Sequence, residues 1–583
     1  MAKILNMLSS KSEGLLTIAS KLGFQPILAT LLTLPVLLLS LPSRNIGFIW
    51  LALVPVAYIV FSMRASVRSL RQSQQSQRIE AGTFLVPRIL IILAITLYGP
   101  VQGLSLWTLL SISIVALSMS CEVPIRNIEK RIEPVAVNLP LSKFINGPRI
   151  PSILTVLGSL AWIAIFLIST ALLPQSPIII AVLAGIQGLL TLAILLHYAF
   201  VYFKQQSQGK KLGNALSEYQ PKFILHWDAP ANTTYQITMW LPYLERVGVP
   251  FVVLVRNRIN FDEVRHLTSR PVILRKSITS LDDVIVDSLK TILYVNTATV
   301  NNHLVRYTHL THIQLNHGES DKAASYNPAF KVFTKNFVAG QAAIDRFTKN
   351  GVSTPLDFFE IVGRPQVENI HLVSNVDNTG QVKSILYAPT WHGFYEDSNY
   401  SSLSIGLVLV EEIHKAGHRV IFRPHPYSLR SARYRRDIAE IQAYLAQTNA
   451  SEGSNHKFGP AAEQVGIVDL MNESTALISD VSSVVSDYLY SEKPFSVVCI
   501  NQTLDALRSN MPLSDAAYVL DCASEDTGHK AKSVRVEVQT VLHGLLEDDT
   551  LQRSRLEFKK YYLGDIPYEE RVTRFLTALN QYL

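Results

Sequence analysis

The chain has 583 residues, of which 48% are hydrophobic and 17% are charged, and its mean hydropathy is +0.20. This composition is too apolar for a disordered chain or for a chain that is soluble throughout. Residues 1–212 hold 17 Lys and Arg against five Asp and Glu, whereas the remainder holds 36 against 41. A nucleic-acid binder carries its basic excess on its soluble part, so we expect no nucleic-acid partner.

Six apolar segments in residues 1–212 are long enough to predict membrane-spanning helices, since about 20 residues cross a bilayer. The third segment must begin near Thr83, with Arg88 snorkelling to the interface. We expect no Asp, Glu, Lys, Arg or paired polar cluster in the middle of the spans, which favours an anchor or a lipid-handling platform over a transporter. The segments lie near Phe24–Leu41, Ile46–Met63, Ile89–Tyr98, Val101–Ser118, Ile153–Leu173 and Ile178–Phe203.

The basic residues of the connecting loops predict how these spans face. Alternate loops carry three, four, five and three Lys or Arg, whereas the other loops carry Arg44 and no further Lys or Arg. Because positive loops stay cytoplasmic, both ends of a multi-pass cell-membrane domain over residues 1–212 are expected in the cytoplasm. The odd number of widely spaced cysteines supports neither a disulfide framework nor a zinc site.

After a polar linker (Gln205–Glu218), strand and helix patterns alternate, which is typical of a parallel sheet. We predict an α/β fold with two Rossmann-like doubly wound halves, residues 219–382 and 383–583, and a ligand in the cleft between them. Strands are expected at Lys222–Trp227, Pro250–Arg256, Val272–Leu274, Ile292–Val295, Thr311–Leu315, Lys331–Val338, Lys383–Tyr387, His418–Phe422, Gly466–Leu470, Ala476–Ser479 and Pro494–Ile500, and helices at Tyr235–Val247, Leu403–Ala416 and Ser482–Tyr490.

Two loops at predicted strand ends carry polar residues and an aromatic residue. After Thr311–Leu315, His317 can accept a proton, Gly318 allows close backbone approach, and Lys322 can meet an anion. The alternative is a turn with a capping Ser or Asp. At the end of Lys383–Tyr387, Thr390 and Trp391 can flank a nucleotide, or they form a tight turn with a packed tryptophan.

Two further loops predict a phosphate site. Two prolines flank His425 beside Arg423, which restricts the backbone and suits binding of an anion, although a surface turn is the alternative. In the segment from Asp480 to Asp487, Ser482 and Ser483 open a predicted helix whose free amides and hydroxyls can hold phosphate. Ordinary N-capping by Asp480 or Ser482 explains the same residues locally.

The spacing of histidines does not favour a metal. His309 and His312 lie three residues apart in or near a strand, where such residues point to opposite faces, and no HExxH spacing occurs. The sequence also lacks a Walker loop, a GxGxxG motif and a useful GxSxG motif, which disfavours an ATPase, a dinucleotide oxidoreductase and an α/β-hydrolase. We therefore expect neither a metal nor a cofactor.

The four loops together resemble the CDP-glycerol glycerophosphotransferase family of teichoic-acid primases and polymerases, over roughly residues 222–580. The family's H-G-x-x-x-K fits His317, Gly318 and Lys322, and its A-P-T-W fits Ala388–Trp391. Its R-x-H-P fits Arg423–Pro426, and its D-x-S-S-x-x-x-D fits Asp480, Ser482, Ser483 and Asp487. Three departures concern the acceptor and the transferred group: Glu319–Asp321 replaces a Thr-Pro-Leu-like stretch, Gly363–Gln366 replaces a Gly-Tyr-Pro-Arg-like turn, and six spans replace peripheral attachment.

The resemblance implies a GT-B-like fold and phosphotransfer in cell-wall teichoic-acid biosynthesis. A glycerol-phosphate or related polyol-phosphate group would move from a CDP-activated donor to a lipid-linked or polymeric glycan acceptor. His317 would act as the base, His425 with Arg423 and Lys322 would stabilise the leaving phosphate, and the other motif residues would bind substrate. The alternatives are a GT-B glycosyltransferase that uses a nucleotide sugar, and a non-catalytic membrane scaffold that binds a nucleotide or a polymer.

Overall fold

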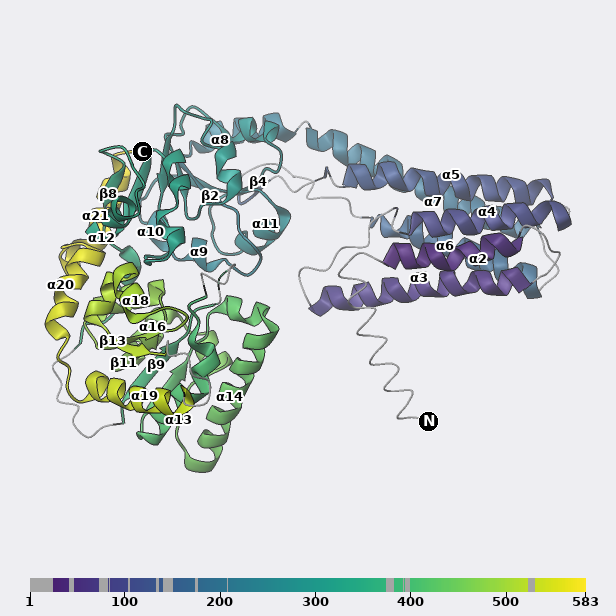
Figure 1. Cartoon of the computed structure of the whole chain (residues 1–583). Coiled ribbons are helices and arrows are strands. Elements are labelled where there is room, and N and C mark those ends of the chain that lie inside the picture. The colour runs from purple at the N-terminus through teal and green to yellow at the C-terminus, as the bar shows by residue number, and fades with distance from the viewer. Residues whose placement is uncertain are drawn as a thin grey trace. The chain divides into compact units, whose positions relative to one another are not determined.

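The chain divides into a helical unit, Met1–Ala215, and an α/β unit, Leu216–Leu583, in the computed structural model of the protein (Figure 1). Each unit has a hydrophobic core of its own. The structure describes residues 25–40, 47–72, 82, 84–102, 105–129, 131–132, 136–139, 150–172, 177–206, 208–373, 382–391, 393, 399–522 and 530–583.

Apolar helices that pack side by side form the helical unit (Figure 1). Three helices in its described part, α5 to α7, are long and apolar enough to cross a membrane, and three shorter apolar helices precede them. The expectation of an apolar helical region before the α/β region is therefore confirmed, while the number of spans stays a prediction. The bounds are α2 (Gln25–Ser40), α3 (Gly47–Gln72), α4 (Leu85–Gln102), α5 (Leu106–Glu129), α6 (Ile153–Leu172) and α7 (Pro177–Gln206), with a short strand β1 (Ala136–Val137).

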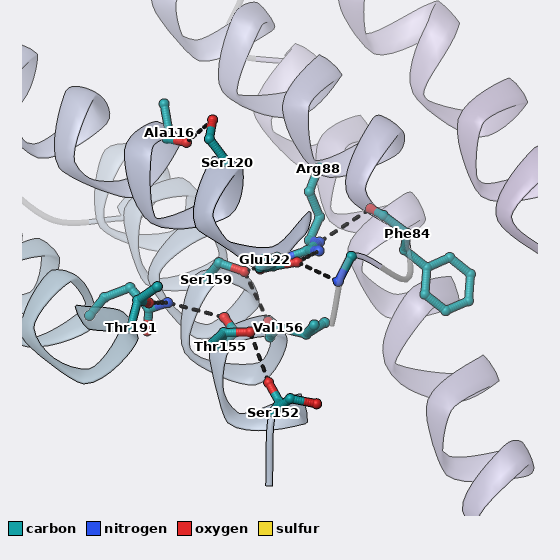
Figure 2. A network of polar contacts seen from close by, with 12 residues as sticks. Phe84, Arg88, Ala116, Ser120, Glu122, Ser152, Thr155, Val156, Ser159 and Thr191 are labelled. Atoms are coloured by element: carbon teal, nitrogen blue, oxygen red, sulfur yellow. Dashed lines mark hydrogen bonds and ion pairs between the residues drawn. The ribbon is translucent and has the colours of Figure 1, made fainter. Parts of the chain in front are cut away.

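Arg88 of α4 does not snorkel to an interface, so that prediction is wrong. Its buried guanidinium forms a bidentate ion pair with Glu122 of α5, with Nη1–Oε1 and Nη2–Oε2 distances of 2.7 and 2.6 Å (Figure 2). Nη1 also donates to Ser159 Oγ of α6, and Nε donates to the carbonyl of Phe84 at 3.2 Å. A paired and hydrogen-bonded arginine can be buried where a lone one cannot. The pair lies near the start of α4 and beyond the predicted span Val101–Ser118, so it does not test the expected absence of a charged cluster in the middle of the spans.

The first half of the α/β unit is a parallel sheet in which the strands of this unit have the order β4-β3-β2-β5-β6-β7-β8. The strand order reverses between β2 and β5, which makes this the topological switch point of the sheet. The bounds are β2 (Phe223–Trp227), β3 (Phe251–Val255), β4 (Val272–Leu274), β5 (Thr291–Tyr294), β6 (Thr311–Gln314), β7 (Lys335–Val338) and β8 (Phe359–Ile361), with helices α9 (Tyr235–Thr238), α10 (Leu241–Glu245), α11 (Arg258–Val264) and α12 (Gln341–Lys349).

The second half is a parallel sheet of order β10-β9-β11-β12-β13, with buried apolar residues on both faces. The bounds are β9 (Ser384–Ala388), β10 (Arg419–Phe422), β11 (Ala476–Ser479), β12 (Phe495–Cys499) and β13 (Tyr518–Asp521), with helices α13 (Gly406–Lys415), α14 (Ala432–Glu452), α15 (Pro460–Glu463), α16 (Ile467–Glu473), α17 (Ser483–Tyr488), α18 (Leu504–Asn510), α19 (Lys530–Leu546), α20 (Gln552–Leu563) and α21 (Arg571–Asn580).

These two parallel sheets confirm the predicted fold class, a helical region followed by an α/β region of two Rossmann-like halves. Three local predictions are wrong. The expected linker Gln205–Glu218 is largely helix α8 (Gln208–Tyr219), and the expected helix Tyr235–Val247 is two short helices, α9 and α10. The expected strand Gly466–Leu470 is the start of α16, because Leu470 and Met471 pack into the core on helical spacing.

The last helix, α21, packs against the first half of the α/β unit. Phe575 lies 5.2 Å from Trp240 and 6.3 Å from Phe337, measured between ring centroids. Thr291 of β5 donates a hydrogen bond to the carbonyl of Tyr582. The two halves are therefore tied together by the segment that follows the second sheet.

Candidate active site

Four loops meet at the carboxyl ends of β6, β9, β10 and β11, where ligands bind in doubly wound sheets. A Cβ atom placed on Gly318, after β6, would lie 2.9 Å from the Cβ and Oγ atoms of Ser483, after β11. The Nζ atom of Lys322, after β6, donates to Thr390 Oγ1, after β9, at 3.1 Å. The predicted site residues from both halves are thus brought together.

His317 follows a sharp turn at Asn316, whose φ of +59° lies in the left-handed region that asparagine tolerates. Its Nδ1 atom lies 2.7 Å from the carbonyl oxygen of Val295. Because a carbonyl can only accept, Nδ1 carries the proton and Nε2 is an acceptor when the ring is neutral. Burial lowers the pKa of His317, the Val295 carbonyl opposes this change, and the charge of Arg364 adds to it. The ring is therefore suited to accept a proton at Nε2.

His425 has the opposite tautomer. Its Nδ1 atom accepts the backbone N–H of Tyr427 at 3.1 Å, so the neutral ring carries its proton on Nε2. Burial lowers its pKa to about 3, and the positive charges of Lys322 and Arg423 contribute. His425 is therefore a neutral hydrogen-bond donor in this structure.

Tyr235, at the start of α9, lies beside both histidines. Its ring centroid is 6.2 Å from that of His317 and 6.2 Å from that of His425, in edge-on arrangements. Trp391 stacks on His425, with centroids 6.2 Å apart, and contacts Tyr427 edge-on at 5.1 Å. The two histidines therefore share Tyr235 as a neighbour, and His425 is packed among aromatic rings.

Lys322, Thr390 and Asp480 form a connected polar group. Asp480 is fully buried, and its Oδ2 atom accepts the backbone N–H groups of Thr390 and Ser402 at 2.7 and 3.2 Å. Burial raises the pKa of Asp480 to about 7, and burial lowers the pKa of Lys322 to about 8. Asp480 thus holds the Thr390 loop in place. The ammonium of Lys322 donates one N–H group to Thr390 and has further N–H groups that can bind another acceptor.

Ser482 occupies the N-cap position of α17, but its side chain makes no capping hydrogen bond. Its Oγ atom lies 3.2 Å from that of Ser479, which itself donates to the carbonyl of Ala388 at 2.6 Å. The N-capping interpretation of Ser482 is therefore not observed. Ser483 faces Gly318, and this close approach explains why a glycine stands at position 318.

The two predicted charged residues Arg423 and Asp487 differ in their partners. Within the part of the chain that the structure describes, the guanidinium of Arg423 makes no hydrogen bond or ion pair, and burial lowers its pKa. Asp487 instead binds Arg364 through both oxygens, at 2.6 and 3.0 Å. Asp487 is therefore occupied by Arg364, whose charge acts on His317.

Tyr235 and Arg364 are functional candidates that sequence reasoning missed. Tyr235 lies on the connection after β2, at the switch point of the sheet, so the strand-end rule signalled this region but not the residue. Arg364 follows Gly363, whose φ of +74° marks a sharp turn that directs the next residue inward. Among the described residues, no group of three His, Cys, Asp or Glu side chains has the arrangement of a metal site.

Residues 363–503 match the model of the CDP-glycerol:poly(glycerophosphate) glycerophosphotransferase family. No curated protein sequence matches the chain. Among solved structures, the wall teichoic acid polymerase TagF is 12% identical with a TM-score of 0.39, over 66% of this chain and 95% of its own. A Rickettsia africae glycosyltransferase is 13% identical with a TM-score of 0.33, over 59% of this chain and 100% of its own. Anabaena Alr3699/HepE, solved in complex with UDP and glucose, is 9% identical with a TM-score of 0.36, over 62% of this chain and 99% of its own.

The family match covers three of the four loops, those of Thr390, Arg423 and Ser482. It confirms the resemblance, which had been drawn from these motifs. Over residues 363–503, the chain resembles CDP-glycerol glycerophosphotransferases.

Proposed function

We propose that this enzyme transfers a glycerol-phosphate or related polyol-phosphate group from a CDP-activated donor to a lipid-linked or polymeric glycan acceptor. The observation that carries the proposal is the pair of opposed histidine tautomers. His317 presents an acceptor nitrogen and His425 presents a donor N–H, and both rings flank Tyr235. One histidine is suited to remove a proton and the other to stabilise negative charge.

The reaction then follows from these groups. An acceptor hydroxyl loses its proton to His317 Nε2 while its oxygen attacks the phosphorus that bears the glycerol. The bond from this phosphorus to the oxygen of CMP breaks, and CMP leaves with the electron pair. Lys322, Arg423 and the Nε2–H of His425 supply positive charge and a hydrogen bond for the departing phosphate. The lowered pKa of His317 keeps its ring neutral and ready to accept the proton near neutral pH.

The remaining predicted residues have supporting roles in this proposal. Thr390 and Asp480 hold Lys322 and the β9 loop, and Trp391 forms a wall beside His425. Gly318 allows the two halves to approach at Ser483. In the complex with the donor, Ser482 and Ser483 would bind the phosphates through their hydroxyls. Asp487 acts through Arg364.

The helical unit anchors the enzyme in the cell membrane in this proposal. The positive loops predict a multi-pass arrangement with the α/β unit on the cytoplasmic side. This orientation agrees with the chemistry, because nucleotide-activated donors are made in the cytoplasm. Reporter fusions after residue 212 should be active only as cytoplasmic reporters, and an external signal would overturn the orientation.

The experiment that tests the function is a donor panel. The purified full chain is incubated with CDP-glycerol, CDP-ribitol or UDP-glucose and with membranes that supply acceptors, and the released nucleotide is measured. We expect release of CMP from a CDP-polyol. Release of UDP alone would replace the proposal with a glycosyltransferase.

A further inference from the structure

We propose that Arg346 and Tyr562 are positioning residues for the transfer reaction: they clamp the loop that carries His317 and Lys322. The inference rests on the proposed function and concerns Glu319–Asp321, the stretch in which this chain departs from the family pattern. Nothing in the motif itself signals these two residues, because they lie 27 and 241 residues from their partners in the loop.

Residues of the loop after β6 contact two different parts of the α/β unit. Gly318 faces Ser483, and Lys322 contacts Thr390, so these residues face the second half of the α/β unit. Glu319 and Asp321 lie between them in the sequence, are buried, and contact Arg346 of α12 and Tyr562 of α20 instead. Because these residues are joined by a few backbone bonds, whatever holds the two carboxylates also limits the positions of His317 and Lys322.

The two carboxylates share one arginine. Arg346 of α12 forms ion pairs with Glu319 Oε2 at 3.1 Å and with Asp321 Oδ1 at 2.8 Å, and all three side chains are nearly fully buried. Glu319 Oε1 also accepts the backbone N–H of Ala339 at 3.3 Å. A buried carboxylate without such partners would be strongly unfavourable, so the loop is held in one position.

Tyr562 of α20 completes the clamp from the far end of the chain. Its hydroxyl donates to Asp321 Oδ2 at 2.7 Å, and its ring lies 5.8 Å from the guanidinium carbon of Arg346. A Cβ atom on Gly340 would lie 2.5 Å from the carbonyl of Tyr561 and 2.8 Å from that of Tyr562, so α12 and α20 meet backbone to backbone. The clamp is therefore rigid on both of its sides.

The neighbouring tyrosine provides a matched control. Tyr561 donates to Asp345 Oδ2 at 2.7 Å and joins the same helices, but Asp345 belongs to α12 and not to the loop. Tyr561→Phe removes one hydroxyl and one hydrogen bond, whereas Tyr562→Phe also removes the hydrogen bond that its hydroxyl accepts from the backbone N–H of Leu513 at 3.2 Å. The Asp321→Ala background separates the two contacts of Tyr562, because a loss of stability through Leu513 persists in that background and a loss of positioning through Asp321 does not.

The experiment measures CMP release from CDP-glycerol and the dissociation constant of CDP for both full-length variants. We expect Tyr562→Phe to lower kcat about tenfold, since small displacements of reacting groups cost up to about 100-fold. CDP affinity should fall about two- to tenfold through Lys322, as expected for one hydrogen bond. Tyr561→Phe should leave both quantities unchanged, and in an Asp321→Ala background Tyr562→Phe should have little further effect.

The outcomes separate this inference from the proposed function. Equal effects of the two tyrosine variants, or no effect of Tyr562→Phe, overturn the clamp while CMP release by the unmodified chain still supports the transferase. If the unmodified chain releases no nucleotide, the proposed function fails, and the difference in CDP affinity between the two variants decides the clamp. If the unmodified chain does not bind CDP, both are overturned.

Discussion

Positively charged side chains have different partners in the two units of this protein. In the helical unit, every guanidinium nitrogen of Arg88 is used, by Glu122, Ser159 and the carbonyl of Phe84 (Figure 2). In the α/β unit, Lys322 donates to Thr390, and Arg423 has no ion-pair partner among the described residues. The guanidinium nitrogens of Arg88 all donate within the protein, whereas Lys322 and Arg423 keep donors that the proposed function assigns to the donor phosphates.

The difference follows from the cost of burying charge. A charge in an apolar surrounding must be paired and hydrogen-bonded, or the fold loses stability. A charge that remains unpaired at a strand end lowers the stability of the fold unless a ligand of opposite charge binds to it. Such groups are therefore candidates for binding sites. Arg346 and Arg364 belong with Arg88 in this respect, because carboxylates hold both in place. Four predictions test this comparison.

The largest effect is expected at His317. The variant His317→Ala should lower kcat for CMP release by about 10²–10⁴-fold, the usual contribution of a general base, without loss of membrane insertion. His309→Ala, which changes an exposed histidine of the same half, is the control and should retain full activity. Near-normal turnover of His317→Ala would remove this residue from the catalytic group.

Breaking the Arg88–Glu122 ion pair of the helical unit should lower stability without changing the binding of CDP. Glu122→Leu leaves Arg88 buried and unpaired, which should destabilise the helical unit by about 3–5 kcal/mol. Adding Arg88→Met removes the unpaired charge and should restore most of that loss. Thermal unfolding of the full chain in one detergent measures the stability, and CDP affinity of the folded protein should be unchanged in both variants. A stable single variant, or a change in CDP affinity, would contradict the contrast between the units.

Substitution of Arg423, which has no ion-pair partner among the described residues, should weaken the binding of CDP. Arg423→Ala should weaken CDP binding about 10- to 100-fold, since a hydrogen bond to a charged group contributes about 1.5–3 kcal/mol. Arg423→Lys should rescue this loss only partly, because an ammonium does not reproduce the planar guanidinium. Ser483→Ala should have the smaller effect of one neutral hydrogen bond. Calorimetry on the full chain with CDP measures all three variants, and unchanged affinity in Arg423→Ala would place the phosphates elsewhere.

The smallest effect concerns pH. The pKa of His317 lies below its usual value, through burial and the charge of Arg364, so the acid limb of kcat/KM should lie below pH 6.5. Arg364→Gln removes a positive charge and leaves the negative charge of Asp487 without its partner. This change should raise the pKa of His317 and move the acid limb to higher pH. Asp487→Asn leaves the Arg364 charge unopposed and should move it to lower pH. Shifts in the same direction would exclude an electrostatic effect of this pair.

Much of the α/β unit could be predicted because its signals are local. Phe251–Val255 is a continuous apolar run, and it forms a strand buried on both faces. The polar motifs follow such runs directly, so their meeting at one edge follows from parallel pairing. The segment Gly466–Leu470 was assigned wrongly because a short apolar run does not distinguish a strand from a helix, and packing of Leu470 decided it.

The contacts that could not be predicted join residues that are distant in the sequence. Arg88 and Glu122 are 34 residues apart, and an arginine near the start of an apolar segment has the same local pattern whether it is paired or snorkels. Tyr235 lies outside the motifs, and Arg364 lies in a turn where the chain departs from the family pattern, so their places in the site follow from the fold alone. The tautomers of His317 and His425 depend on backbone groups, which no motif contains.

The hydrogen bond from Tyr562 to Asp321 has a consequence for how the protein is made. Ribosomes synthesise a chain from its N-terminus, and N-terminal domains generally fold first. The loop at 317–322 is synthesised some 240 residues before Tyr562. The contact between β5 and Tyr582 likewise forms only after the end of the chain has been made. A nascent or prematurely terminated chain therefore has its apolar helices and most of its motif residues but lacks the contacts that hold the loop. Under the proposed function, such incomplete products would use little of the donor.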